Sequence, residues 1–66
     1  MSVGTNLKRL RMEKGMSQEE LANAVHVSQS MIAQIERGTK GLVIELAKEI
    51  LEVLGASIEE IWGESG

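Results

Sequence analysis

The chain has 66 residues, a formal net charge of −3 and no cysteine. We expect residues 1–66 to form a single domain, because this length leaves no room for a separate sensing or catalytic domain. Disulfides and thiolate metal sites are excluded, and a domain this small buries only about 60% of its unfolded surface, so a partner subunit is the expected source of added stability.

Proline is absent and glycines follow three helical patterns, which predicts helices with glycine C-caps and no strands. The first predicted helix covers about residues 6–14, with Thr5 as its N-cap and with Leu7 and Leu10 on its apolar face. The first sixteen residues carry four basic side chains against one acidic side chain, so this end of the chain is positive.

The next two predicted helices are separated by only two residues. The second starts at Ser17, which forms a capping box with the glutamate three residues on. The third follows Ser28, whose hydroxyl can cap its exposed amides, and it stops at Gly38. Because so short a join prevents antiparallel packing, we expect a helix-turn-helix over about residues 17–37.

The last two predicted helices form the acidic part of the chain, which has one lysine against six glutamates from Gly41 onward. The fourth covers about residues 44–54 and has Val43 where a polar cap is usual. The fifth is short and starts at Ser57, which has the spacing of a second capping box with Glu60. The basic end can therefore face phosphate while the acidic end points away.

The outward face of the third predicted helix carries polar side chains that suit the edges of DNA bases. Glutamine can donate to and accept from adenine, serine can take either role, and alanine offers a methyl contact to thymine in the major groove. The alternative is that these are ordinary solvated helix residues. The candidate base-contacting residues are Gln29, Ser30, Ala33 and Gln34.

The sequence resembles the phage repressor and Cro-like helix-turn-helix regulators, the XRE family, over about residues 7–63. The resemblance rests on LKRLRMEKGMSQEELA, VSQSMIAQIERG and LEVLGASIEEIWG, with the expected spacings between them. It implies an all-α, five-helix fold like that of the lambda repressor DNA-binding domain. It also implies a transcriptional regulator, in the first instance a repressor, that binds a palindromic double-stranded DNA operator as a homodimer.

The resemblance also assigns roles to individual residues. It implies base contacts from Gln29, Ser30 and Gln34, a phosphate contact from Gln18, and an internal ion pair between Arg11 and Glu36. The full set of expected phosphate contacts is Lys8, Ser17, Gln18, Arg37, Thr39 and Lys40.

A dimer interface is expected in the C-terminal third of the chain. This part supplies more apolar side chains than the helical stripes of one small core can absorb, so some of them should face outward. In the family that the sequence resembles, the C-terminal helices commonly form the dimer contact. The alternative for Trp62 is that it closes the core of its own monomer. The expected interface residues are Leu42, Val43, Leu46, Ile58, Ile61 and Trp62.

The sequence departs from the family pattern at the turn and in the loop after the third helix. His26 stands where a turn glycine is usual. A non-glycine residue with positive φ is uncommon, although histidine is among those enriched there, and we expect a slightly reshaped turn. The loop carries Arg37 and Lys40 as its only cations, where the family usually has several basic residues and a proline. These departures and the net negative charge leave a second hypothesis open, namely a protein-binding module such as an antitoxin or anti-repressor that retains the fold.

Catalysis, cofactors and membranes are not expected. The sequence has no cysteine, no aspartate, one histidine and no glycine-rich phosphate loop between strand and helix, so we expect neither enzymatic activity nor a metal, a cofactor or a small-molecule ligand. No apolar run approaches the roughly 20 residues of a membrane helix, and the first residues lack the features of a secretory signal. A cytoplasmic protein is the simplest expectation.

Overall fold

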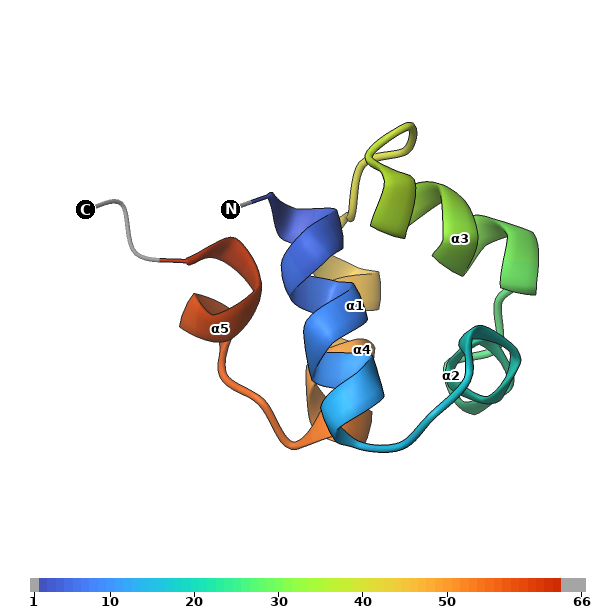
Figure 1. The fold of residues 1–66 in the computed structure, drawn as a ribbon, viewed down its shortest axis with the longest axis horizontal. Coiled ribbons are helices and arrows are strands. Elements are labelled where there is room, and N and C mark those ends of the chain that lie inside the picture. The colour runs from blue at the N-terminus through green and yellow to red at the C-terminus, as the bar shows by residue number, and fades with distance from the viewer. Residues whose placement is uncertain (1, 64–66) are drawn as a thin grey trace.

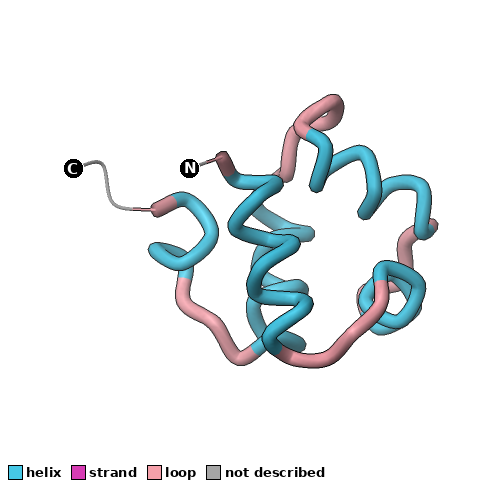
Figure 2. The backbone as a smooth tube through the Cα atoms, in the orientation of Figure 1, coloured by secondary structure: helices cyan, strands magenta, loops and turns pink. Residues whose placement is uncertain are grey.

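The computed structural model describes residues 2–63, which form five helices and no strand. In chain order the helices are α1 (Val3–Glu13), α2 (Gln18–Ala24), α3 (Gln29–Arg37), α4 (Ile44–Leu54) and α5 (Ile58–Trp62). Helices α2 and α3 pack against each other on one side of α1, α5 lies on its other side, and α4 lies behind α1 in the view of Figure 1. Short loops connect the helices (Figure 2). The five helices confirm the prediction of an all-α, five-helix fold.

Serine side chains begin the first three helices. The Ser17 hydroxyl accepts from the N–H of Glu20 and the Glu20 carboxylate accepts from the N–H of Ser17, so the predicted capping box is present. Ser28 caps α3 as predicted, by accepting from the N–H of Met31 at 3.1 Å. The cap predicted for α1 was wrong. Ser2, not Thr5, is the N-cap, and α1 therefore begins one turn earlier than expected.

The other helix ends follow the predicted pattern except at α5. Gly38 and Gly55 end α3 and α4 in the left-handed conformation, and Val43 gives α4 no side-chain cap. The second capping box does not form. Ser57 is at the N-cap position of α5 without a side-chain hydrogen bond, and the Glu60 N–H donates to the main-chain carbonyl of Ser57 at 3.0 Å.

The turn between α2 and α3 is built around His26. Its φ is 62°, which makes it the single non-glycine residue with positive φ among residues 2–63. His26 therefore takes a left-handed conformation in spite of its side chain. Left-handed backbone is disfavoured for side chains with a Cβ, although histidine is among the residues enriched there.

The core is shared by all five helices, which hold α3 against the body of the molecule. Side chains from each helix are completely buried at its centre. The largest of these are Leu7, Leu21, Ile32, Ile35, Ile50 and Ile61.

Two contacts of α1 fix its position against its neighbours. The Asn6 side chain is 4% exposed and donates to the main-chain carbonyl of Ile61 over 2.7 Å, which ties α1 to α5. Gly4 lies against the last turn of α3, so closely that a Cβ there would collide with the main-chain carbonyl groups of Ile35 and Glu36. Together these contacts fix α1 between α5 and α3.

Candidate nucleic-acid interface

Helix α3 presents one buried face and one accessible face. Ile32 and Ile35 are fully buried. Gln29 and Ser30 are exposed in the first turn, and Gln34 is half-buried one turn later, together with Ala33. The four candidate base-contacting side chains therefore lie on the part of α3 that the core does not cover.

Ser30 and Gln34 are already connected to each other. The Gln34 side-chain nitrogen donates to the Ser30 hydroxyl oxygen at 3.1 Å, one helical turn away. The carboxamide oxygen of Gln34 and the hydroxyl proton of Ser30 stay available, so the pair can offer an acceptor and a donor side by side. The main chain of Gln34 also accepts from the Thr39 hydroxyl at 3.2 Å, which closes the end of α3.

The predicted ion pair between Arg11 and Glu36 is present and buried. Arg11 donates to both carboxylate oxygens of Glu36, from Nε to Oε2 at 2.7 Å and from Nη2 to Oε1 at 3.1 Å. The two side chains are 9% and 4% exposed. Arg11 also donates from Nη1 to the main-chain carbonyl of Met16 at 2.7 Å. One arginine thus joins α1, the end of α3 and the segment that leads into α2.

Gln18 also donates a hydrogen bond to Glu36, and the sequence pattern could not predict this contact. Its side-chain nitrogen donates to Oε1 of Glu36 at 3.1 Å, and the residue is half-buried at the start of α2. The two residues lie on different helices, so no local spacing rule connects them. The candidate phosphate contact therefore sits directly beside the buried ion pair.

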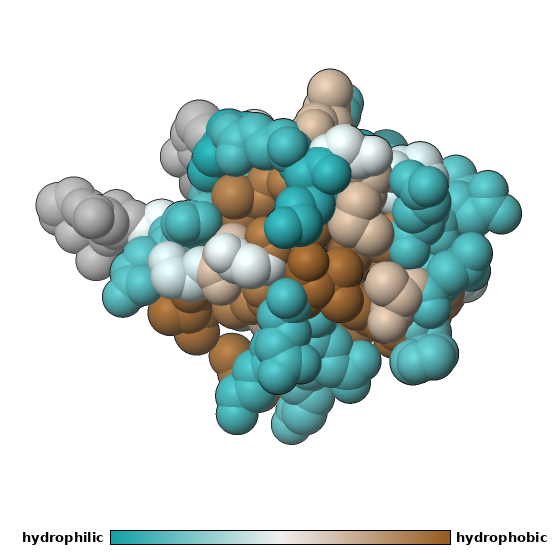
Figure 3. Space-filling view, turned by 90° about the horizontal axis from the view of Figure 1, so that it is seen from below, coloured by the Kyte–Doolittle hydropathy of each residue, from teal (hydrophilic) through white to brown (hydrophobic). Residues whose placement is uncertain are grey.

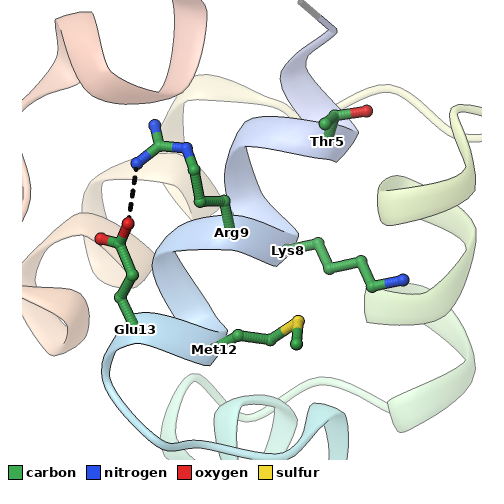
Figure 4. A pocket seen from close by; sticks show the side chains of 5 residues that line it. All are labelled: Thr5, Lys8, Arg9, Met12 and Glu13. Atoms are coloured by element: carbon green, nitrogen blue, oxygen red, sulfur yellow. Dashed lines mark hydrogen bonds and ion pairs between the residues drawn. The ribbon is translucent and has the colours of Figure 1, made fainter.

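The cations among the candidate phosphate contacts lie on α1 and around the end of α3. Arg37 and Lys40 are exposed, and Lys8 extends from α1 on the side where α3 lies (Figure 4). Arg9 points to the other side of α1 and pairs with Glu13 at 3.2 Å. Of the other phosphate candidates, Thr39 and Ser17 are exposed, and the Ser17 hydroxyl is engaged in the cap of α2.

The acidic side chains of the C-terminal third are separated from this face. The glutamates of α4 and α5 are all exposed and belong to helices other than the helix-turn-helix pair. Glu64 lies outside the described residues. The net charge of −3 is therefore unevenly distributed: α1 carries mostly basic side chains, and α4 and α5 carry mostly acidic ones.

The expected dimer residues separate into exposed and buried groups. Val43, Ile58 and Trp62 are exposed, Trp62 by 41%. Leu42 is half-buried. Leu46 and Ile61 are 8% and 0% exposed, so assigning them to an interface was wrong, because they fill the core of their own chain.

The exposed apolar residues border a shallow groove between the start of α4 and α5. We call this the α4–α5 patch; its groove is lined by Ile44, Ile58, Glu59, Trp62 and Gly63, and Val43 adjoins it in sequence. In the space-filling view from below, hydrophobic surface reaches solvent among hydrophilic side chains (Figure 3). A second groove joins Trp62 to Leu42 and Lys40, so the patch adjoins the loop that follows α3.

Comparison with known proteins identifies the family. A helix-turn-helix family model matches residues 7–61. The chain is 37% identical over 59 residues to the HTH-type transcriptional regulator y4dJ of Sinorhizobium fredii, covering 89% of this chain and 77% of that protein. It is 31% identical over 64 residues to the immunity repressor protein of Bacillus phage phi105, covering 97% of this chain but 44% of that protein.

A solved structure gives the same result. The clp gene regulator ClgR from Corynebacterium glutamicum superposes with a TM-score of 0.85 at 36% sequence identity, covering 89% of this chain and 63% of that chain. The chain therefore belongs to the helix-turn-helix family of transcriptional regulators, of the phage repressor and Cro-like type. This is a family of DNA-binding regulators and not of enzymes.

Among residues 2–63 no group of three metal-ligating side chains is close enough together to hold an ion. None of the helices in the same range has the length and apolar character needed to cross a membrane.

Proposed function

We propose that this chain is a sequence-specific regulator, in the simplest case a repressor, that binds a palindromic operator as a homodimer. Helix α3 enters the major groove, where Gln29, Ser30, Ala33 and Gln34 read base edges. The observation that carries the proposal is the division of α3, whose apolar face is fully buried while its polar face is left accessible. A helix held in this way can enter a groove without exposing its core side chains.

Phosphate contacts would surround that helix. The exposed cations Lys8, Arg37 and Lys40 can approach the DNA backbone from α1 and from the end of α3. Ser17, Gln18 and Thr39 can add neutral hydrogen bonds to phosphate oxygens. Because the glutamates of α4 and α5 lie outside the helix-turn-helix pair, their negative charge need not oppose this approach.

Homodimerisation is proposed through the α4–α5 patch. Val43, Ile58 and Trp62 expose apolar surface to solvent, and such surface is typical of an interaction site. Tryptophan is also one of the residue types that most often anchor interfaces. A symmetric contact uses the same patch on both copies, and it holds the two α3 helices at a fixed distance from each other. That spacing is what a palindromic operator requires.

A second candidate function is protein binding with the same fold, as in an antitoxin or anti-repressor. The net charge of −3 and the sparse cations of the loop after α3 favour it. The α4–α5 patch would then receive a different protein, and α3 would have no nucleic-acid ligand.

Salt dependence of binding to random duplex DNA separates these two functions. Neutralising phosphates releases counterions, so the proposed function predicts that log affinity falls linearly with log salt, with a slope of about −0.9 for each phosphate contact. The exposed cations should therefore give a slope of several units. Absence of duplex binding at low salt would reject DNA binding and leave the protein-binding candidate.

A further inference from the structure

Gln18 connects the buried ion pair to the surface. Its side-chain nitrogen donates to Oε1 of Glu36 at 3.1 Å, while the residue as a whole remains half-buried. It is the first residue of α2, in the helix-turn-helix pair. One N–H of this carboxamide is therefore held inside the molecule by Glu36, and the rest of the group can meet a ligand.

The hydrogen bond to Glu36 fixes which way the carboxamide points. An ionised carboxylate can only accept hydrogen bonds, so Gln18 must turn its nitrogen, and not its oxygen, toward Glu36. The nitrogen has a second N–H that this bond does not use. A phosphate oxygen can accept a hydrogen bond from this second N–H, whose direction is fixed by the bond to Glu36.

Glu36 is itself held in place by Arg11. The arginine donates to both carboxylate oxygens, at 2.7 and 3.1 Å, so the carboxylate cannot rotate without breaking a bidentate contact. Arg11 also compensates the negative charge, which would otherwise repel a phosphate close to Gln18. With 4% of its side chain exposed, Glu36 is too deeply buried to contact DNA itself.

We propose that Glu36 is a positioning residue for DNA binding. Held by Arg11, it fixes the carboxamide of Gln18 so that the free N–H faces the DNA backbone. The ion pair between Arg11 and Glu36 then has a role in binding in addition to joining α1 to α3. This inference rests on the proposed function, because Gln18 contacts phosphate only if the chain binds duplex DNA.

A double-mutant cycle on duplex binding tests the proposal. In the parent chain, Gln18→Ala should lower the affinity for random duplex about tenfold, because a hydrogen bond to a charged group is lost. Glu36→Gln leaves Arg11 and Gln18 one acceptor oxygen to share in place of two. In that background the carboxamide of Gln18 is no longer fixed, and Gln18→Ala should lower the affinity less than about twofold.

A matched control separates positioning from loss of stability. Ile61→Val reduces packing in the core at α5, on the far side of α1 from α2 and α3, and leaves Glu36 in place. In this background Gln18→Ala should keep its full effect of about tenfold. Equal effects of Gln18→Ala in the parent, Glu36→Gln and Ile61→Val chains would overturn the proposal, as would no effect in the parent.

A measurement on the parent chain decides the matter if Glu36→Gln fails to fold. The side-chain amide of Gln18 should have an NMR order parameter close to the value of about 0.85 for rigid backbone. A value below about 0.6 would show a freely moving carboxamide and would overturn the inference. Failure of the proposed function is recognised separately, because the parent chain would then bind no duplex before any residue is changed.

Discussion

Gly4, in the first turn of α1, lies directly against the main-chain carbonyl group of Glu36 in the last turn of α3. No side chain fits between the two helices at this point. The contact lets α1 approach α3 closely enough for Arg11, two turns further on, to reach the carboxylate of Glu36.

Gly4→Ala should therefore destabilise the fold by about 1–3 kcal/mol, because its methyl group would have to displace backbone. This exceeds any gain from the better helix propensity of alanine. Gly41→Ala is the matched control, since nothing lies within 4 Å of a Cβ at that position. It should change the unfolding free energy by less than about 0.5 kcal/mol. Urea unfolding followed by circular dichroism measures both, and equal midpoints would contradict the close approach.

Arg11 and Arg9 offer a comparison between a buried and an exposed ion pair on the same helix. Arg11→Ala leaves Glu36 buried without its partner and should cost about 3–5 kcal/mol. Arg9→Ala removes an exposed pair with Glu13 and should cost at most about 1 kcal/mol. Urea unfolding curves give the free energy of unfolding of both variants. They should be recorded at low temperature, so that the destabilised Arg11→Ala chain is still folded without urea. Similar losses for the two variants would mean that the burial of the Arg11 pair contributes nothing.

Base readout and phosphate contact should separate by residue. Gln34→Ala should cost about 1–3 kcal/mol on the best operator and relax preference at one base pair. Lys40→Ala should instead weaken operator and random duplex alike and reduce the salt slope by about one unit. Lys48→Ala, which removes an exposed lysine from α4, is the control and should leave both affinities unchanged. Loss of sequence preference in the Lys40→Ala chain would contradict this division.

The position of the α4–α5 patch indicates which substitution should break the proposed dimer. Ile58→Asp places a charge on an exposed residue at the start of α5, where a negative side chain is compatible with the helix dipole, so the chain should stay folded. Sedimentation equilibrium should then find a monomer. Met12→Asp makes the same kind of change at an exposed residue of α1 outside the patch and should leave the dimer intact. A monomeric parent chain would overturn the proposed dimer, and a dimeric Ile58→Asp chain would place the interface elsewhere.

Local sequence signals predicted much of this fold because they act within one helical turn. Ser17, Ser28 and Gly38 cap their helices as their spacing indicated. Where two serines or threonines compete, spacing alone does not decide, and α1 starts at Ser2 in place of Thr5. At Ser57 the spacing was right, but the backbone carbonyl accepts the hydrogen bond in place of the side chain.

The contacts that shape the candidate site join helices distant in sequence, and the sequence pattern did not reveal most of them. The hydrogen bonds from Asn6 to Ile61 and from Gln18 to Glu36 have no periodic or capping signal. Helical spacing also could not divide the apolar residues of a five-residue helix between core and surface. Packing places Ile61 in the core and leaves Ile58 exposed. The ion pair between Arg11 and Glu36 was predicted from family resemblance and not from spacing.

Selection of bound duplexes from a random DNA pool tests whether this chain binds a palindromic operator as a dimer. Two α3 helices on one symmetric dimer should enter successive major grooves, about 34 Å apart. We expect enrichment of an inverted repeat whose half-sites are centred about 10 to 10.5 base pairs apart. A pool that shows no enriched sequence, although the chain is folded and dimeric, would contradict the claim that this protein is a sequence-specific regulator.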